Sequence, residues 1–339
     1  MIFDAMLPDT VDSAEDSAVQ ERAGFGTTWT TETSQDPFIH LTLAAERTST
    51  IGLGTAVAIA FARNPMSTAL TANHLHQVSG GRLLLGLGTQ VKAHIERRFS
   101  MPWSHPAARM REYVLALRAI WNCWNSGEAL VFDGRFYQHS LMPPLFDPGP
   151  NPFGAPPVYV AGVGERMAAV AGEVADGFLA PPLATAAYLR QVLLPAVAVG
   201  SARSNDVVTS TFQTCAMPLV ATGCGPAELD AAIEATRARL AFYASTPAYR
   251  TILQLHGWAH VSEQLGDCAK RHEWSAMPQF ITDTMLDTFA TVASPGEVTT
   301  ALRKRYEGIA DRVIMYPVQP WSAALTAEVL RSSSRADSN

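Results

Sequence analysis

A glycine-rich turn in the middle of the chain carries the first candidate binding site. Gly162-Val163-Gly164 follows the apolar segment 157–161 and precedes a helical pattern that begins near Glu165. Glycines at such a junction let backbone N–H groups approach a phosphate, and the positive end of the helix dipole favours its negative charge. The alternative is an ordinary strand-to-helix turn whose glycines only satisfy the backbone conformation. The spacing therefore predicts a phosphate site at Gly162, Val163 and Gly164, with the plain turn left open.

A histidine is the second candidate, for proton transfer. His94 follows the apolar segment 83–88 and is accompanied by Glu96, Arg97 and Arg98. Imidazole changes its charge close to neutral pH, so a histidine beside a ligand can donate or accept a proton. We predict a catalytic role for His94 in a loop, against the alternative of a structural or exposed histidine. The two arginines either contact an anionic ligand or form a solvated basic cluster.

Small residues end the segment 83–88 and are the third candidate. Gly88 and Thr89 follow Gly86 and Leu87, and glycines at the end of a strand leave room for a ring-shaped ligand. The Thr89 hydroxyl could bond to such a ring, although a glycine-rich turn with a satisfied threonine would look the same.

Metal ligands and disulfides are not expected from this sequence. His74 and His76 are two residues apart on a predicted helix and so point to different faces. His256 and His260 are four apart, but no glutamate follows His256 as the HExxH zinc motif requires. The four cysteines lie far apart and form no CxxC pair, which argues against a zinc site and a disulfide framework.

The elements that must position these residues alternate regularly. Eight apolar segments predict strands, at 2–7, 27–31, 50–59, 83–88, 157–161, 176–180, within 207–220, and at 311–318. Helical patterns follow the strands, at 10–23, 36–48, 64–78, 106–124, 165–174, 188–199, 227–240 and 321–330. Parallel strands need such crossover helices. Eight repeats predict an α/β fold of the (β/α)8 TIM-barrel type, with an open doubly wound sheet as the alternative. The candidate residues then follow strands, at the barrel end where active sites lie.

The chain is predicted to form one domain over residues 1–330, because no internal linker with a shift in composition interrupts it. The segment 242–285 fits no simple strand–helix unit and is predicted as an insertion between the seventh and eighth strands. Residues 331–339 are polar and serine-rich, so we expect a disordered tail.

Composition excludes several classes of partner. The 339 residues include 25 Lys and Arg against 31 Asp and Glu, with no long run of like charge. We therefore expect no binding to nucleic acid. No apolar stretch reaches the roughly 18–20 residues that span a bilayer, and the N-terminus, with Asp4 and no basic region, does not resemble a signal peptide. We expect a cytoplasmic protein.

Several segments, taken in order, resemble the bacterial luciferase-like flavin oxidoreductases. They are 54–57 (GTAV), 63–65 (RNP), 75–88 (LHQVSGGRLLLGLG), 157–162 (PVYVAG) and 171–177 (AGEVADG). The likeness covers roughly residues 1–200, and 286–320 more loosely. It is strongest to the branch that uses the deazaflavin coenzyme F420, with FMN-using monooxygenases as close relatives. The resemblance implies a TIM barrel whose mouth holds the cofactor ring, and hydride transfer between that cofactor and an organic substrate.

The resemblance also implies positions for the cofactor. Thr55, Ala56 and Val57 are expected beside the central ring, with a non-proline cis peptide bond between Ala56 and Val57. Glu32, which follows the second strand, is expected to contact the cofactor and is a candidate for catalysis; the alternative is a solvated loop carboxylate. The cofactor phosphate is expected at the glycine-rich turn.

Two positions depart from a sugar-phosphate-oxidising branch of the F420 group. That branch has an aspartate and a catalytic histidine where this sequence has Glu32 and Thr33, and a glutamate where it has Val91. A threonine hydroxyl is no general base near neutral pH without an activating partner. The departures argue against oxidation of sugar phosphates and leave the proton donor open.

Three functions follow from these observations. The first is an F420-dependent oxidoreductase acting on a small organic substrate. The second is a reduced-FMN-dependent monooxygenase, which would need oxygen and a separate reductase. The third is a cofactor-free barrel that acts as a binding protein. Apolar residues on the helices 36–48 and 64–78, together with the resemblance, predict a homodimer.

Overall fold

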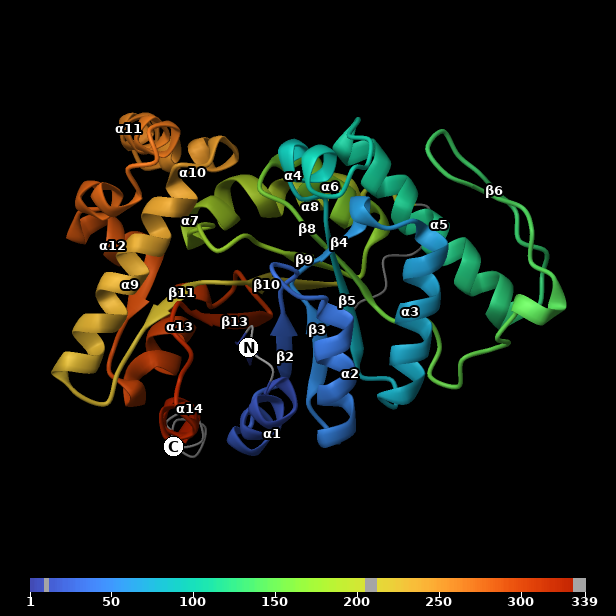
Figure 1. The fold of residues 1–339 in the computed structure, drawn as a ribbon, viewed down its shortest axis with the longest axis horizontal. Helices are drawn as coiled ribbons and strands as arrows, with labels where there is room; N and C mark the ends of the chain where they lie inside the picture. Colours follow the sequence, from blue (N-terminus) through green and yellow to red (C-terminus); the bar gives the residue numbers. More distant parts are fainter. Residues whose placement is uncertain (9–11, 205–211, 332–339) are drawn as a thin grey trace.

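Parallel strands close into a barrel in the computed structural model, which describes residues 1–8, 12–204 and 212–331 (Figure 1). The barrel strands, in order, are β1 (Ile2–Met6), β2 (Thr27–Thr30), β3 (Gly52–Thr55), β5 (Leu83–Gly88), β8 (Val158–Ala161), β9 (Gly177–Leu179), β10 (Gln213–Ala216) and β13 (Arg312–Pro317). β13 pairs in parallel with β1 and closes the ring. The predicted TIM barrel is confirmed, and the open sheet is excluded.

Two of the predicted strands are interrupted. The strand predicted at 50–59 ends at Thr55 and resumes as β4 (Ala58–Ile59), which pairs with β5. The strand predicted within 207–220 is divided into β10 and β11 (Leu219–Ala221), and residues 207–211 lie outside the described residues. β11 pairs with both β13 and β12 (Ala290–Val292), a strand that the sequence did not indicate.

Helices cover the outside of the barrel close to their predicted positions. They are α1 (Ser13–Ala23), α2 (Pro37–Arg47), α3 (Pro65–Val78), α5 (Pro106–Ser126), α6 (Glu165–Val174), α9 (Pro226–Ala244) and α14 (Ala323–Arg331). The helix predicted at 188–199 is a composite of α7 (Ala186–Tyr188), a π-helical turn (Leu189–Leu193) and α8 (Leu194–Ser201). The loop predicted around His94 is wrong, because α4 (Lys92–Arg97) forms there.

Side-chain caps explain why two helix starts could be predicted. The carboxylate of Asp36 accepts a hydrogen bond from the backbone N–H of Phe38 at 2.9 Å. Asn64 caps α3 in the same way through the N–H of Ser67, also at 2.9 Å. Proline follows each cap, and its fixed φ suits the first helical position.

Between β11 and β13 the chain builds a group of helices at one side of the barrel, opposite the β6–β7 hairpin (Phe132–Asp133 and Gln138–His139) (Figure 1). After α9 come η4 (Pro247–Tyr249), α10 (Arg250–Leu255), α11 (Ala259–Lys270), η5 (Trp274–Phe280), α12 (Asp283–Phe289), η6 (Pro295–Glu297) and α13 (Val298–Tyr306). The first residues of the segment 242–285 thus complete α9. Residues 332–339, most of the predicted tail, lie outside the described residues.

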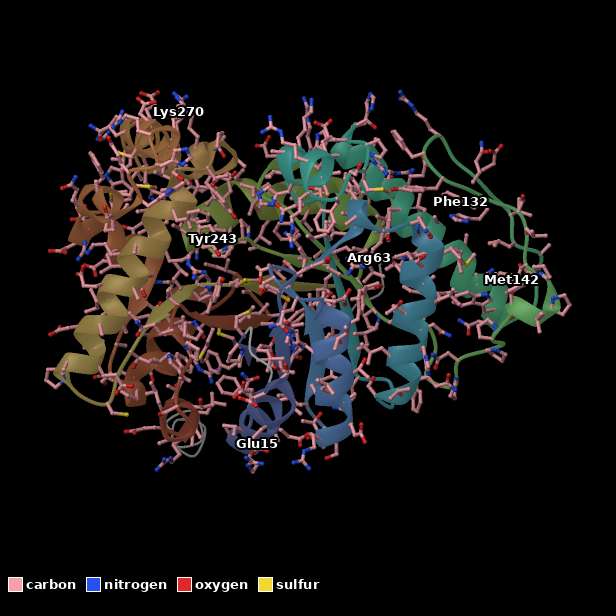
Figure 2. The ribbon with its side chains drawn as sticks, viewed as in Figure 1. Glu15, Arg63, Phe132, Met142, Tyr243 and Lys270 are labelled. Atoms are coloured by element: carbon pink, nitrogen blue, oxygen red, sulfur yellow. The ribbon has the colours of Figure 1, made fainter. Side chains whose placement is uncertain are left out.

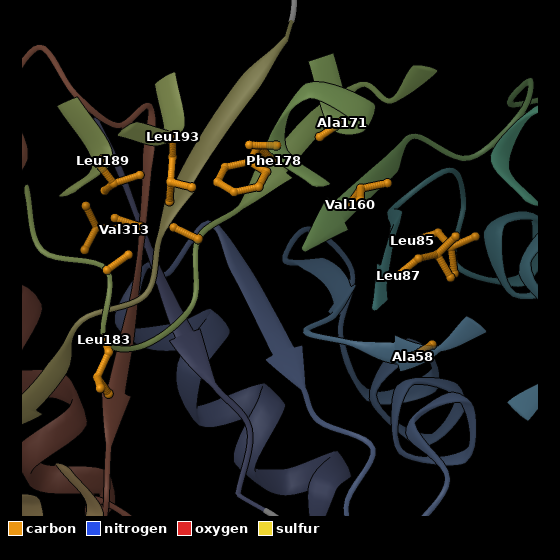
Figure 3. Close-up of a cluster of buried hydrophobic side chains, with 14 of the residues drawn as sticks. Ala58, Leu85, Leu87, Val160, Ala171, Phe178, Leu183, Leu189, Leu193 and Val313 are labelled. Carbon is orange, nitrogen blue, oxygen red and sulfur yellow. The ribbon is translucent and has the colours of Figure 1, made fainter. Parts of the chain in front are cut away.

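The core lies in two places, between the strands and the helices and inside the barrel. Leu85, Val160, Phe178 and Val313 are buried between strands and helices (Figure 3). A second cluster fills the barrel interior and comprises Met6, Trp29, Ala56, Tyr159, Leu179, Cys215, Met217 and Ile314. Two further 3-10 turns, η1 (Ala60–Ala62) and η2 (Pro144–Phe146), complete the described elements. Among the described helices, none is long and apolar enough to cross a membrane.

Candidate active site

A cavity of about 600 Å³ lies where the barrel strands end. Its walls come from residues at or after the ends of seven barrel strands, from β4 and α4, and from the segment that follows β11. They are Thr31, Glu32, Ala56, Val57, Ile59, Gly88, Thr89, Gln90, Val91, Lys92, Trp103, Pro106, Ala161, Gly162, Val163, Met167, Leu179, Ala180, Pro181, Pro182, Met217, Tyr243, Thr246, Ala248, Tyr249 and Tyr316. This volume is within the range of about 300–1,000 Å³ that small-molecule sites occupy.

A second hollow, of about 500 Å³, adjoins this cavity at the start of α6. Gly164, Glu165 and Arg166 line the second hollow, while Pro106 and Met167 line both spaces. The shared residues place the two spaces side by side.

The peptide bond between Ala56 and Val57 is cis, as the resemblance implied. Both residues line the cavity. The preceding Thr55 is fully buried and does not line it. Its hydroxyl donates to the Gly86 carbonyl oxygen at 2.7 Å and accepts from the Gly86 N–H at 2.9 Å. Thr55 therefore ties β3 to β5 behind the wall, whereas the sequence placed it beside the ring.

Gly86 and Gly88 of β5 mainly allow the neighbouring backbone to approach closely, and making room for a ring is secondary. A Cβ on Gly86 would lie 1.8 Å from the Thr55 carbonyl oxygen, and a Cβ on Gly88 would lie 2.5 Å from Cγ2 of Val57. Gly88 lines the cavity, but Gly86 does not. Both positions must stay free of a side chain so that β5 can pack against residues 55–57.

Thr89 lines the cavity, as predicted for a residue that contacts a ligand. Its hydroxyl donates to the carbonyl oxygen of Gln90 at 2.9 Å. The hydroxyl oxygen can still accept a hydrogen bond from a ligand, because this bond uses only its hydrogen.

Glu32 forms an ion pair in the cavity wall. Its carboxylate accepts from Nη1 of Arg63 at 2.6 and 2.7 Å and from the backbone N–H of Ile59 at 2.7 Å, and its side chain is only 7% exposed. Arg63 also contacts Asp36 at 2.7 Å. Burial opposes the charge of Arg63, but the bonds and charges of the two carboxylates outweigh it and raise the pKa of Arg63. The alternative of a solvated loop carboxylate is therefore wrong for Glu32.

His94 does not join the other candidates. It lies exposed on α4, and neither space has it among its lining residues. α4 instead brings Lys92 to the cavity. Arg98, which follows α4, donates to the carbonyl oxygen of Thr33 and so fastens this helix to the loop after β2.

The glycine-rich turn lies where the cavity meets the hollow. Gly162 and Val163 line the cavity, and Gly164 lines the hollow. Gly164 caps α6 without a side-chain bond and has φ −113°, so no left-handed backbone explains this glycine. A Cβ on Gly164 would meet no heavy atom within 4 Å, whereas one on Gly162 would lie 2.6 Å from Met167. Space is therefore open at the start of α6.

Three tyrosines line the cavity, and the sequence did not reveal them as a group. Tyr243 from α9, Tyr249 from η4 and Tyr316 from β13 come from distant parts of the chain. Nη1 of Arg239 donates to Oη of Tyr316 at 3.1 Å, and Oη of Tyr316 lies 3.2 Å from Oη of Tyr243. Figure 2 shows Tyr243 and Arg63 on opposite sides of the barrel mouth.

Burial keeps two of these phenols protonated. Burial, followed by the neighbouring Tyr316, raises the pKa of Tyr243 well above its ordinary value and that of Tyr249 to about 12. Both hydroxyls therefore remain hydrogen-bond donors across the physiological pH range.

The comparison with known families decides what kind of barrel this is. The Luciferase-like monooxygenase family matches residues 8–312. The chain belongs to this family. It is 50% identical over 313 residues to the Uncharacterized protein Rv1360 of Mycobacterium tuberculosis, with 92% of each chain covered. It is 28% identical over 309 residues to the 5,10-methylenetetrahydromethanopterin reductase of Archaeoglobus fulgidus, with 88% of each covered.

A solved structure shows the same luciferase-like fold. The coenzyme F420 dependent tetrahydromethanopterin reductase from Methanopyrus kandleri superposes with a TM-score of 0.81, at 21% identity, over 98% of this chain and 97% of that one. The resemblance drawn from the sequence motifs is thus confirmed for the family and for the fold. This chain is a luciferase-like oxidoreductase barrel.

Proposed function

We propose that this protein is an F420-dependent oxidoreductase, which transfers a hydride between the deazaflavin and a small organic substrate. The observation that carries the proposal is that the cavity and the hollow adjoin at the start of α6, where no side chain caps the helix. A ligand with a planar ring, a phosphate and a further tail needs such a pair of spaces.

The residues present fit the coenzyme. The ring would lie against Ala56, Val57, Gly88 and Thr89, which all line the cavity, with Gly88 packed next to Val57. The phosphate would lie in the open space at Gly164, where backbone N–H groups and the dipole of α6 favour an anion.

The space beyond α6 favours F420 over FMN. FMN ends at its phosphate, whereas F420 continues into an acidic tail. The adjoining hollow offers about 500 Å³ and is lined by Arg166 as well as Glu165, and the guanidinium of Arg166 is the group that suits such a tail. The structural likeness to a reductase described as F420 dependent supports the same choice.

The chain's own residues position the ligand and exclude water. When bound, the reduced coenzyme supplies the hydride. Glu32 holds the N–H of Ile59 and the guanidinium of Arg63, and so fixes the segment after Val57 on which the ring would rest. Apolar residues such as Trp103 and Met217 line most of the remaining cavity and exclude water from the reacting atoms.

A binding titration tests this function. We expect purified protein to quench the fluorescence of F420 with saturable binding, and reduced FMN to bind more weakly, with no oxygen uptake beyond the autoxidation of free reduced FMN. Tight binding of reduced FMN with oxygen uptake would replace the proposal with a two-component monooxygenase, which needs a separate reductase. Binding of neither ligand would leave a cofactor-free binding protein.

We also propose that the protein forms a homodimer through α2 and α3. Ile39 and Leu43 of α2 are 65% and 44% exposed, and Leu70 and Val78 of α3 are 46% and 56% exposed. A symmetric dimer would bury these side chains against their copies. Light scattering at micromolar concentration should give the dimer mass, and Ile39→Glu should reduce it to that of the monomer. A monomeric parent would refute this assembly.

The cytoplasm is the proposed location. The thiols of all four cysteines, Cys123, Cys215, Cys224 and Cys268, are free, and free thiols are typical of reducing compartments.

A further inference from the structure

The tyrosines on the far wall of the cavity form a set of hydroxyl donors around one arginine. Tyr316 packs against the barrel-interior cluster that includes Ala56, so it faces the same space as the expected ring site. Tyr243 and Tyr249 approach from α9 and η4. No carboxylate pairs with Arg239 among the residues that the structure describes, and its bonds go to the phenols.

Counting hydrogens shows that this set has an unused donor. The Tyr316 oxygen accepts from Arg239, and only one of Tyr243 and Tyr316 can donate in the bond that joins them. The other hydroxyl hydrogen has no acceptor within the described part of the chain. The Tyr249 hydroxyl likewise has no hydrogen-bond partner in that part. The wall therefore offers O–H donors to a ligand and no carboxylate acceptor.

The rest of the wall carries few charged groups. Leu179, Ala180, Pro181, Pro182 and Met217 also line the cavity, and Tyr316 packs against the cluster that includes Leu179 and Met217. The only basic lining residue among those described is Lys92, and the only acidic one is Glu32, which Arg63 already neutralises. An apolar molecule with one hydrogen-bond-accepting oxygen fits this composition.

We propose that the substrate is an apolar aldehyde or ketone, and that Tyr316 binds its carbonyl oxygen and donates the proton when the carbonyl is reduced. This inference deepens the proposed function and rests on it for the source of the hydride. Arg239 acts through Tyr316 and is a positioning residue.

The step balances as a two-electron reduction. The reduced coenzyme, when bound, would supply the hydride that the carbonyl carbon gains and would itself be oxidised by two electrons, while the π pair of the C=O bond moves to oxygen. The phenol proton of Tyr316 follows to that oxygen, so the product is an alcohol. The phenolate remains beside the Arg239 guanidinium and regains a proton from water by way of the Tyr243 hydroxyl.

A chromophoric aldehyde tests the carbonyl site without any turnover. The absorbance of 4-(dimethylamino)cinnamaldehyde shifts to longer wavelength when its carbonyl oxygen accepts a strong hydrogen bond. We expect a saturable red shift with the parent protein and loss of that shift, with binding weakened about tenfold or less, in Tyr316→Phe. Tyr137→Phe is the matched control, because Tyr137 pairs with Arg109 at 2.8 Å and does not line the cavity. The control should shift the aldehyde as the parent does.

Two further measurements separate the roles. With F420 bound, Tyr316→Phe should lower kcat for aldehyde reduction by about a hundredfold or more, the usual contribution of a general acid, with little change in KM. Arg239→Lys should retain most of the red shift, whereas Arg239→Met should lose it. Melting temperatures verify that each variant is folded.

The outcomes distinguish this inference from the proposed function. Absence of aldehyde binding, absence of a red shift in the parent, or an equal shift in Tyr316→Phe would overturn the carbonyl site even if F420 binds. A red shift that depends on Tyr316, in a protein that does not bind F420, would support the carbonyl site and refute the proposed coenzyme.

Discussion

The two ends of the barrel interior contain similar side chains, but in the described part of the chain the large cavity lies at one end, and the other end is filled by a buried ion pair. β13 carries Arg312 at its start and Tyr316 four residues later. Arg312 is buried and bonds to the fully buried Asp4, with Nε to Oδ2 and Nη2 to Oδ1 both at 2.8 Å. The indole N–H of Trp29 donates to the same carboxylate at 3.0 Å.

At the other end, the polar groups of the wall face a cavity. Tyr316 and Tyr249 line it. The guanidinium of Arg239 donates to the Tyr316 hydroxyl there, whereas the guanidinium of Arg312 at the closed end bonds to a carboxylate. A buried ion pair whose hydrogen bonds are satisfied within the protein has nothing left to offer a ligand. The comparison indicates that the closed end supports the fold and the open end is available for binding and chemistry.

Breaking the buried ion pair between Asp4 and Arg312 should cause the largest loss of stability. Asp4→Asn removes the charge that compensates Arg312, and losing one partner of a buried pair costs about 3–5 kcal/mol. We expect urea denaturation to show a loss of that size. Glu15→Gln is the control, because the pair of Glu15 with Arg22 is largely exposed and such pairs contribute about 0–1 kcal/mol. Equal losses in both variants would mean that burial of the first pair does not matter.

A substitution at the start of α6 should instead weaken F420 binding and cost little stability. Gly164→Val places a branched side chain where a Cβ meets no protein atom, at φ −113°, which valine readily adopts. The side chain would occupy the space of the phosphate. Losing one or two charge-assisted contacts of about 1.5–3 kcal/mol each should weaken F420 binding tenfold or more.

A second helix start provides the matched control for this variant. Gly225 caps α9 in an extended conformation, and a Cβ there also meets no heavy atom within 4 Å, but Gly225 lines neither space. Gly225→Val should leave F420 affinity unchanged. Unchanged affinity in folded Gly164→Val would place the phosphate elsewhere and would remove the basis of the coenzyme assignment.

The strands and helices of the barrel could be predicted from the sequence because the sequence signals for them are local. The cap at Asp36 and the helix that starts at Glu165 depend on neighbours a few residues away. The open end depends on contacts between distant residues. Tyr243 and Tyr316 are 73 residues apart and belong to no motif, so only the closed barrel brings them together.

The same reason explains the errors at individual site residues. For Glu32 the sequence left a solvated carboxylate open as the alternative, because its partner, Arg63, lies 31 residues further along the chain. His94 follows the correct strand, but α4 turns it to the exterior. The position of a residue after a barrel strand indicates the correct end of the barrel, whereas the direction of its side chain depends on the local structure that follows.

The smallest expected effect concerns a carboxylate that fastens the loop before β3. Slight burial opposes the charge of Glu21, but the N–H groups of Ser49, Thr50 and Ile51 and the Thr50 hydroxyl bond to it and lower its pKa from 4.5 to about 2. A lowered pKa contributes stability that is present above pH 4.5 and is lost as the pH falls towards 2.

Glu21→Gln keeps an acceptor oxygen but removes the charge, so it should cost about 1 kcal/mol at pH 7, because solvent screens a partly exposed group. Urea denaturation of parent and variant from pH 7 down to pH 3 should show this difference shrinking below pH 4.5, since the unfolded parent then binds a proton at Glu21 that folding must release. The exposed Glu46 on α2 provides the control Glu46→Gln, whose stability should follow the parent at every pH. A difference between Glu21→Gln and the parent that stays constant down to pH 3 would show that the amide fails to fit the loop, and that the charge of Glu21 contributes nothing.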